Sequence, residues 1–252
     1  MSDFDSGILG VTAHRPWPMP DRPWIMTQTW HDLLFAHWPV EQRVLREKVP
    51  PGLPLDLHDG QAWLGIIPFH MTNVAPRAVP PLPFLSAFPE LNVRTYVTLD
   101  GKPGIYFFSL DAGSRVAAAV ARALFGLPYY SATMTVDTSG ADVRYRSMRG
   151  TRMPAAEFAA TYRPAGPVQE PRAGTLEHFL TERYCLYTVD GSFRARRLQI
   201  HHPPWPLQAA DATITANTMA DAAGIRLPSA APLLHFAKRQ DMVAWSMEAV
   251  TG

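Results

Sequence analysis

Ala121–Ala132 has the sequence ARALFGLPYYSA and contains the end of an alanine-rich helix, a turn and the start of a strand. Gly126 readily takes the left-handed conformation with which helices commonly end, and Pro128 cannot continue a helix. Upstream, Ser114 has a hydroxyl that suits an N-cap. The segment therefore predicts a helix over 114–125, followed directly by a strand.

The rest of the chain has the pattern of strands joined by tight turns. Residues 90–99 alternate between two faces, as expected of a strand. Two further strands are predicted near the C-terminus, at 233–238 and 242–247. Asp-Gly or Ser-Gly pairs predict hairpins at 100–101, 139–140 and 190–191. We therefore predict an α+β fold, mostly antiparallel β, with a barrel-like sheet and a few short helices.

The chain contains 25 prolines in 252 residues, a proportion that favours loops and strand ends over long helices. Residues 1–24 are predicted to form a proline-rich N-terminal arm, and residues 25–252 a single domain. Five prolines between residues 75 and 89 predict a long loop of the kind that often shapes a binding site.

Composition excludes several classes of protein. The net charge of +1 predicts no electrostatic attraction to nucleic acid or to a membrane surface. A single cysteine, Cys185, excludes an internal disulfide framework. Neither a signal peptide nor a membrane-spanning apolar segment is recognisable, so we expect a cytoplasmic protein. Nucleotide-binding and zinc-protease motifs are absent from the sequence, and we predict no cofactor and no metal.

Four phrases of the sequence are distinctive: LLFAHWP at 33–39, PELNVRTYV at 89–97, ERYCLY at 182–187 and HHPPWPLQ at 201–208. Together they resemble an uncharacterised bacterial family, the YqjF-like proteins. This family in turn resembles acetoacetate decarboxylase, mainly over residues 45–132. The resemblance implies an acetoacetate decarboxylase-like barrel.

The decarboxylases carry a pair of lysines where this chain has Tyr129 and Tyr130. The resemblance also implies that Glu90, which lies 39 positions before Tyr129 (129 − 90 = 39), is a pocket residue. A lysine amine forms the Schiff base through which the decarboxylases release CO2, and a phenol cannot form one. Of the three lysines in the chain, only Lys238 lies on a predicted strand, and a surface position is expected for it. We therefore predict that the protein is not a Schiff-base decarboxylase.

Glu90, Arg94 and Tyr129 are the main candidate site residues. Glu90 and Arg94 share one strand face, which is either the wall of a pocket or a solvated face. An ion pair between them would either hold Arg94 in place to bind a carboxylate or be a structural salt bridge. Tyr129 and Tyr130 must point to opposite sides of their strand. Three further residues are candidates to line the same cavity: His31, Tyr187 and His202.

Two functions remain open from the sequence. The first is a binding module whose partner is a small-molecule ligand, either a small organic acid or an apolar metabolite, held in an internal cavity. The second is a lysine-independent enzyme with Glu90 as acid or base and Tyr129 as hydrogen-bond donor to a carbonyl substrate. The sequence leaves homo-oligomerisation open.

Overall fold

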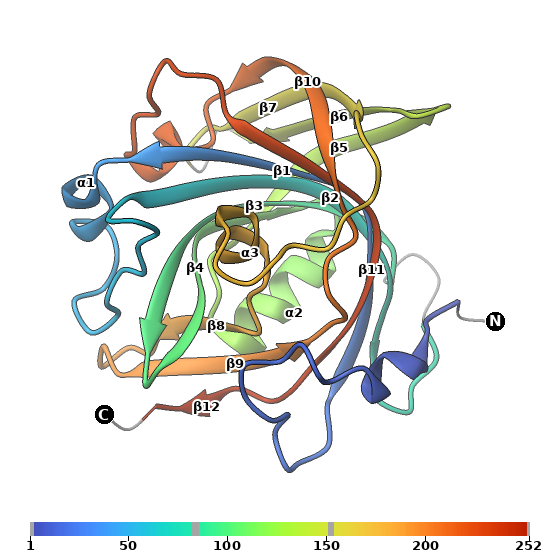
Figure 1. Ribbon diagram of the computed structural model, residues 1–252, viewed down its shortest axis with the longest axis vertical. Coiled ribbons are helices and arrows are strands. Elements are labelled where there is room, and N and C mark those ends of the chain that lie inside the picture. Colours follow the sequence, from blue (N-terminus) through green and yellow to red (C-terminus); the bar gives the residue numbers. More distant parts are fainter. Residues whose placement is uncertain (1–2, 82–85, 151–153, 251–252) are drawn as a thin grey trace.

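Figure 1 shows the computed structural model of the protein, which describes residues 3–81, 86–150 and 154–250. The helices are α1 (Gln42–Arg46), α2 (Arg115–Phe125) and α3 (Leu176–Thr181), with short 3-10 helices η1 (Ser6–Gly10) and η2 (Asp221–Ala223). The strands are β1 (Met26–Val40), β2 (Ala62–Pro76), β3 (Phe88–Leu99), β4 (Lys102–Ala112), β5 (Tyr129–Ser139), β6 (Asp142–Arg149), β7 (Glu157–Pro164), β8 (Cys185–Val189), β9 (Ala195–His201), β10 (Leu207–Asn217), β11 (Leu233–Ala244) and β12 (Glu248–Ala249).

All twelve strands belong to one sheet, in the order β12-β9-β8-β4-β3-β2-β1-β11-β10-β7-β6-β5. Two additional pairings close it. The parallel pairing of β4 with β5 closes the nine strands from β4 to β5 into a mixed barrel. The pairing of β9 with β11 closes a second ring, formed by β9, β8, β4, β3, β2, β1 and β11. The predicted α+β barrel is confirmed.

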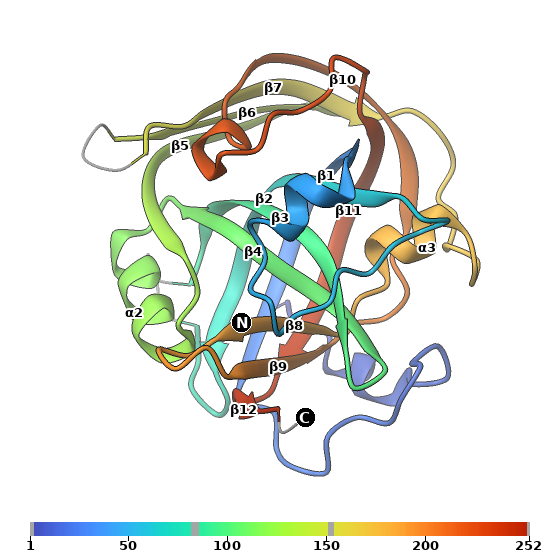
Figure 2. The same cartoon turned by 90° about the vertical axis from the view of Figure 1, so that its left-hand side faces the viewer.

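The five strands shared by both rings bury both of their faces. One face packs against the layer of β5, β6, β7 and β10, seen at the top of Figures 1 and 2. From the shared strands this core takes Leu34, Ala36, Leu64, Ile66, Leu91, Val93 and Phe236, and from the layer it takes Tyr145, Phe158 and Tyr162. The opposite face of the same strands is closed over by β8 and β9. Alternation along each strand therefore separates a packed core from a second interior.

The helix predicted from the opening segment forms as expected. The Ser114 hydroxyl accepts a hydrogen bond from the amide of Ala117, and Gly126 ends α2 in the left-handed conformation with φ of 64°. Figure 2 shows α2 and α3 on opposite sides of the barrel. The C-terminal prediction was wrong in one respect: the two strands expected at 233–238 and 242–247 are one continuous strand, β11. Its Arg239 and Gln240 pair in register with β1, so no turn interrupts it.

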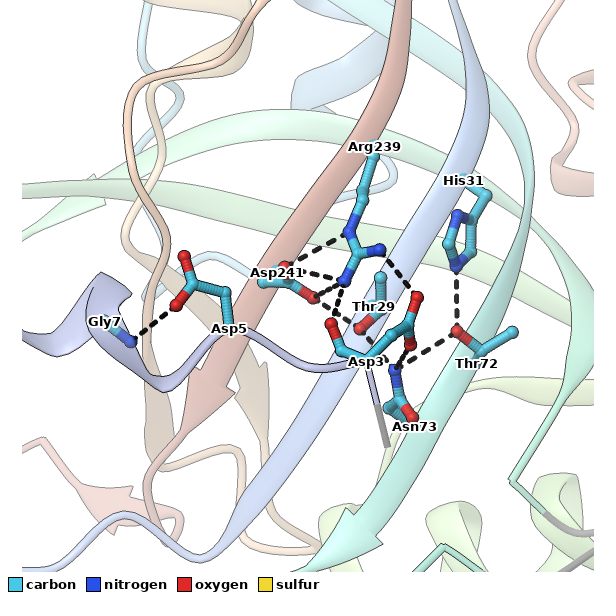
Figure 3. A network of polar contacts seen from close by, with 9 residues as sticks. All are labelled: Asp3, Asp5, Gly7, Thr29, His31, Thr72, Asn73, Arg239 and Asp241. Carbon is cyan, nitrogen blue, oxygen red and sulfur yellow. Dashed lines mark hydrogen bonds and ion pairs between the residues drawn. The ribbon is translucent and has the colours of Figure 1, made fainter. Parts of the chain in front are cut away.

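The N-terminal residues pack against the barrel. Ile8 is buried with Val243 and Trp245, and the indole of Trp17 donates to the side chain of Gln199. Figure 3 shows how Asp3 accepts hydrogen bonds from Asn73 and Arg239. The division into an arm and a domain at residue 24 stays a prediction.

Among the described residues, no helix is long and apolar enough to cross a membrane.

We predict that Leu91→Ala lowers the free energy of unfolding by about 2–5 kcal/mol, because Leu91 is fully buried between the two layers and truncation leaves a cavity. Leu124→Ala is the matched control, since Leu124 is 66% exposed, and its effect should stay within about 0.5 kcal/mol. Chemical denaturation measures both. Equal effects of the two substitutions would contradict the assignment of the core.

Candidate functional site

A cavity of about 570 Å³ lies inside the second ring, and every strand of that ring contributes to its wall. The side of the cavity near α2 is lined by that helix. Most of the lining is apolar and includes Phe35, Phe69, Phe107 and Trp205. Among the described residues, its polar side chains, apart from the indoles and Cys185, are Gln28, Ser86, Glu90, Asn92, Arg94 and Tyr129. The volume is within the range of small-molecule sites.

Glu90 and Tyr129 meet in this cavity from β3 and β5. The Tyr129 hydroxyl donates a hydrogen bond of 3.1 Å to Oε2 of Glu90. Burial raises the pKa of Glu90 to about 8, with a smaller contribution from the negative charge of Asp111. Burial and the neighbouring Glu90 raise the pKa of Tyr129 well above its usual range. Glu90 is therefore largely protonated at neutral pH, and the pair carries no net charge.

A buried ion pair lies next to this site and fixes the start of β5. Nε of Arg149, on β6, donates a 3.1 Å hydrogen bond to Oδ2 of Asp111, and Nη2 donates a second hydrogen bond to Oδ1. Its guanidinium also lies 4.0 Å from the ring centroid of Tyr130. Tyr129 and Tyr130 therefore have separate surroundings, one at the cavity and one at Arg149, as predicted from strand alternation. Asp111 pairs in parallel register with Tyr130, so this contact holds β5 against β4.

Arg94 is a buried guanidinium on the cavity wall, only 7% exposed. It donates a 3.1 Å hydrogen bond to the carbonyl oxygen of Leu180 and lies 5.6 Å from the ring centroid of Phe35. The ion pairs of the described residues include none with Arg94, so the proposed pairing with Glu90 was wrong. Four residues along a strand span about 13 Å, which is too far for an ion pair.

Three of the predicted site residues lie outside the cavity. His31 bonds to the Thr72 hydroxyl at 2.8 Å, in the network of Figure 3. The Tyr187 hydroxyl donates a 2.8 Å hydrogen bond to the carbonyl oxygen of Lys102. His202 stacks on Tyr184, with ring centroids 4.8 Å apart. Each therefore has a structural contact of its own, and none of the three lines the cavity.

His31 lies outside the cavity because β1 changes face at a bulge. Asp32 has a φ of 51°, and the pairing with β2 is irregular between His31 and Ala36. Trp30 points into the cavity before this bulge, and Leu33 points into it after. An uninterrupted alternation would have required an even separation between them.

Several other site features bear on the sequence predictions. Asn92 lines the cavity between Glu90 and Arg94 but was not among the predicted site residues. Its position on the same alternating strand face as Glu90 and Arg94 is the sequence signal that could have identified it. Val79 and Pro80 also line it, as expected of the proline-rich loop, although residues 82–85 of that loop lie outside the described residues. No group of three or more histidine, cysteine, aspartate or glutamate side chains among the described residues is placed to hold a metal ion.

The DUF2071 family, described as an uncharacterized conserved protein, matches residues 27–241, and the chain belongs to this family. The protein YqjF of Bacillus subtilis (strain 168) is 50% identical over 231 residues, which cover 91% of this chain and 94% of that protein. The resemblance predicted from the sequence is confirmed.

Solved structures of the same fold include acetoacetate decarboxylase from Legionella pneumophila. It has a TM-score of 0.63 and 12% identity, over 100% of this chain and 98% of the decarboxylase. The enduracididine biosynthesis enzyme MppR complexed with pyruvate has a TM-score of 0.62 and 13% identity, over 95% of this chain and 93% of that enzyme. At such low identity these likenesses show the fold alone.

We predict that Asp111→Asn lowers the pKa of Glu90 below about 8. The substitution removes a nearby negative charge and leaves the Arg149 cation beside the site, and both changes favour the ionised form of Glu90. Carbon NMR of glutamate-labelled protein, titrated with pH, measures this pKa, and Glu90→Gln identifies the signal. Asp241→Asn, in the remote network of Figure 3, is the control and should not move it. An unchanged or raised pKa in Asp111→Asn would contradict the prediction.

Proposed function

We propose that this member of the DUF2071 family binds a small carboxylate with an apolar body in the barrel cavity. The observation that carries the proposal is Arg94, a buried guanidinium that has no carboxylate partner among the described residues. A cation taken out of water without a counter-ion is costly, and a bound anion would remove that cost. Arginine also matches the planar geometry of a carboxylate with two donors.

The rest of the cavity agrees with a ligand of this kind. Its apolar walls favour a hydrocarbon body, because burying apolar surface is the main favourable contribution to binding. Glu90 is largely neutral below about pH 8, so it neither neutralises Arg94 nor repels an anionic ligand. One solved structure of the same fold is described as complexed with pyruvate, itself a small carboxylate.

Schiff-base chemistry has no support at this site. No lysine occurs among the described residues that line the cavity. Lys238, the strand lysine, is exposed and forms an ion pair with Asp32 at 2.6 Å. Noncovalent binding is therefore the function that the side chains favour.

A second candidate function is acid–base catalysis at Glu90. The observation that favours it is a carboxyl group whose pKa is raised to about 8 by burial, close to the pH at which a general acid or base works best. The hydroxyl of Tyr129 would supply a hydrogen bond to a carbonyl substrate. Turnover that is lost in Glu90→Gln would select this enzyme, whereas a ligand retained without turnover would select the binding module.

We predict that Arg94→Gln weakens binding of an apolar carboxylate such as dodecanoate by roughly ten- to a hundredfold, the range expected when a charged hydrogen bond is lost. Isothermal titration calorimetry measures the affinity. Arg122→Gln is the control, because Arg122 lies exposed on α2. The affinity of this variant for dodecanoate should equal that of the native chain. Thermal unfolding without ligand verifies that both variants fold. Equal affinities in both variants would contradict the role of Arg94.

We also predict that borohydride reduction with acetoacetate leaves no covalent adduct. A phenol cannot form the iminium that borohydride traps, and Tyr129 stands where the decarboxylases carry lysine. Mass spectrometry of the intact protein is the measurement, with a lysine-dependent decarboxylase as positive control. An adduct on Lys48, Lys102 or Lys238 would contradict the prediction.

A further inference from the structure

Three of the polar side chains that line the cavity form one row along β3. Glu90, Asn92 and Arg94 line the cavity at every second residue of that strand. Gln28, from β1, is already engaged, because its side-chain oxygen accepts a 2.7 Å hydrogen bond from the indole of Trp30. Side chains two residues apart on one strand lie about 6.7 Å apart, so the row extends over about 13 Å from Glu90 to Arg94.

We propose that the ligand has two polar ends: a carboxylate bound by Arg94, and a second oxygen, about 13 Å away, that accepts a hydrogen bond at the Glu90–Tyr129 pair. This inference rests on the proposed function and adds to it the ligand's second group and its length. Oxo acids and related oxygenated acids of medium chain length form the matching chemical class. An unsubstituted fatty acid would fill the apolar space and leave the buried polar pair without a partner.

The hydrogen bonding at Glu90 defines what this second group must be. Tyr129 donates to Oε2 of Glu90, which leaves Oε1 to carry the proton of the neutral acid. The protonated Glu90 is then a hydrogen-bond donor, and its matching partner on the ligand is a hydrogen-bond acceptor. The other titratable groups nearby are Asp111 with its partner Arg149, and Tyr145, whose hydroxyl donates 2.7 Å to the main-chain oxygen of Glu90.

The exposed rim of the cavity indicates how such a ligand is oriented. Among the described residues, those that both line the cavity and are exposed are all apolar: Ile25, Val79, Val116, Val120 and Leu124, with two prolines. They come from α2 and from the segments next to the start of β3, at the end where Phe88 and Glu90 lie. Arg94 lies farther along β3 and contacts Leu180 of α3, on the opposite side of the barrel (Figure 2). The carboxylate therefore enters first, and the second oxygen stays nearer the opening.

Calorimetry with two probes of equal length tests the proposal. The probes are dodecanoate and the oxo acid of the same chain length that ends in a methyl ketone, whose oxygen only accepts. At about pH 6 the native chain should bind the oxo acid roughly tenfold more tightly, the gain expected for one buried hydrogen bond. At about pH 9, above the pKa of Glu90, the ionised carboxylate no longer donates and the preference should be lost.

Two substitutions of Glu90 make the test specific. Glu90→Leu should abolish the preference for the oxo acid at both pH values. Glu90→Gln retains a donor that does not ionise, so it should keep a preference that no longer depends on pH. Thermal unfolding verifies that both variants fold.

The outcomes separate this inference from the proposed function. If the native chain binds both acids equally, or if Glu90→Leu keeps the preference, the two-ended ligand is wrong while carboxylate binding stands. If the native chain binds neither acid, carboxylate binding itself is wrong, and the inference fails with it.

Discussion

The structure depends on five strands that line both the packed core and the cavity. β4, β3, β2, β1 and β11 belong to both closed rings, so their central residues alternate between the packed core and the cavity. On β3 this places Leu91 and Val93 in the core and Glu90, Asn92 and Arg94 in the cavity. Because the side-chain period is two, a shift of one residue would exchange the two sets and bury these polar side chains in the core. The register of the barrel and the composition of the site are therefore fixed by the same pairing.

Much of this was readable from the sequence, because the signals are local. The alternation of 90–99, the glycine hairpins and the caps of α2 each depend on a few neighbouring residues, and each forms as predicted. The register between Glu90 and Tyr129 was readable only through family resemblance. The hydrogen bond between their side chains places these two residues together, while their role with a ligand stays a prediction.

The errors arose where a long-range contact overrides a local pattern. The left-handed Asp32 shifts the phase of β1, and its main-chain oxygen accepts a hydrogen bond from Tyr162, 130 positions away. No sequence window around His31 contains that partner. The continuity of β11 likewise depends on pairing with β1 along its whole length. Arg94 lines the cavity as predicted, but its partner is the Leu180 carbonyl and not Glu90, because two residues on one strand face need not be in contact.

The absence of lysine from the described cavity lining limits what the cavity can do with a carboxylate. Schiff-base chemistry requires an amine that attacks the substrate. Here the cations of this region are guanidinium groups: Arg149 is held by Asp111 behind β5, and Arg94 lies four residues along the strand from Glu90. A guanidinium does not give up its proton in a protein, so neither group can act as the nucleophile. Electrostatic attraction and hydrogen bonding remain, and both would act on a bound acid without forming a covalent bond to it. If the cavity holds a carboxylate as proposed, its side chains favour retention of the ligand over covalent conversion.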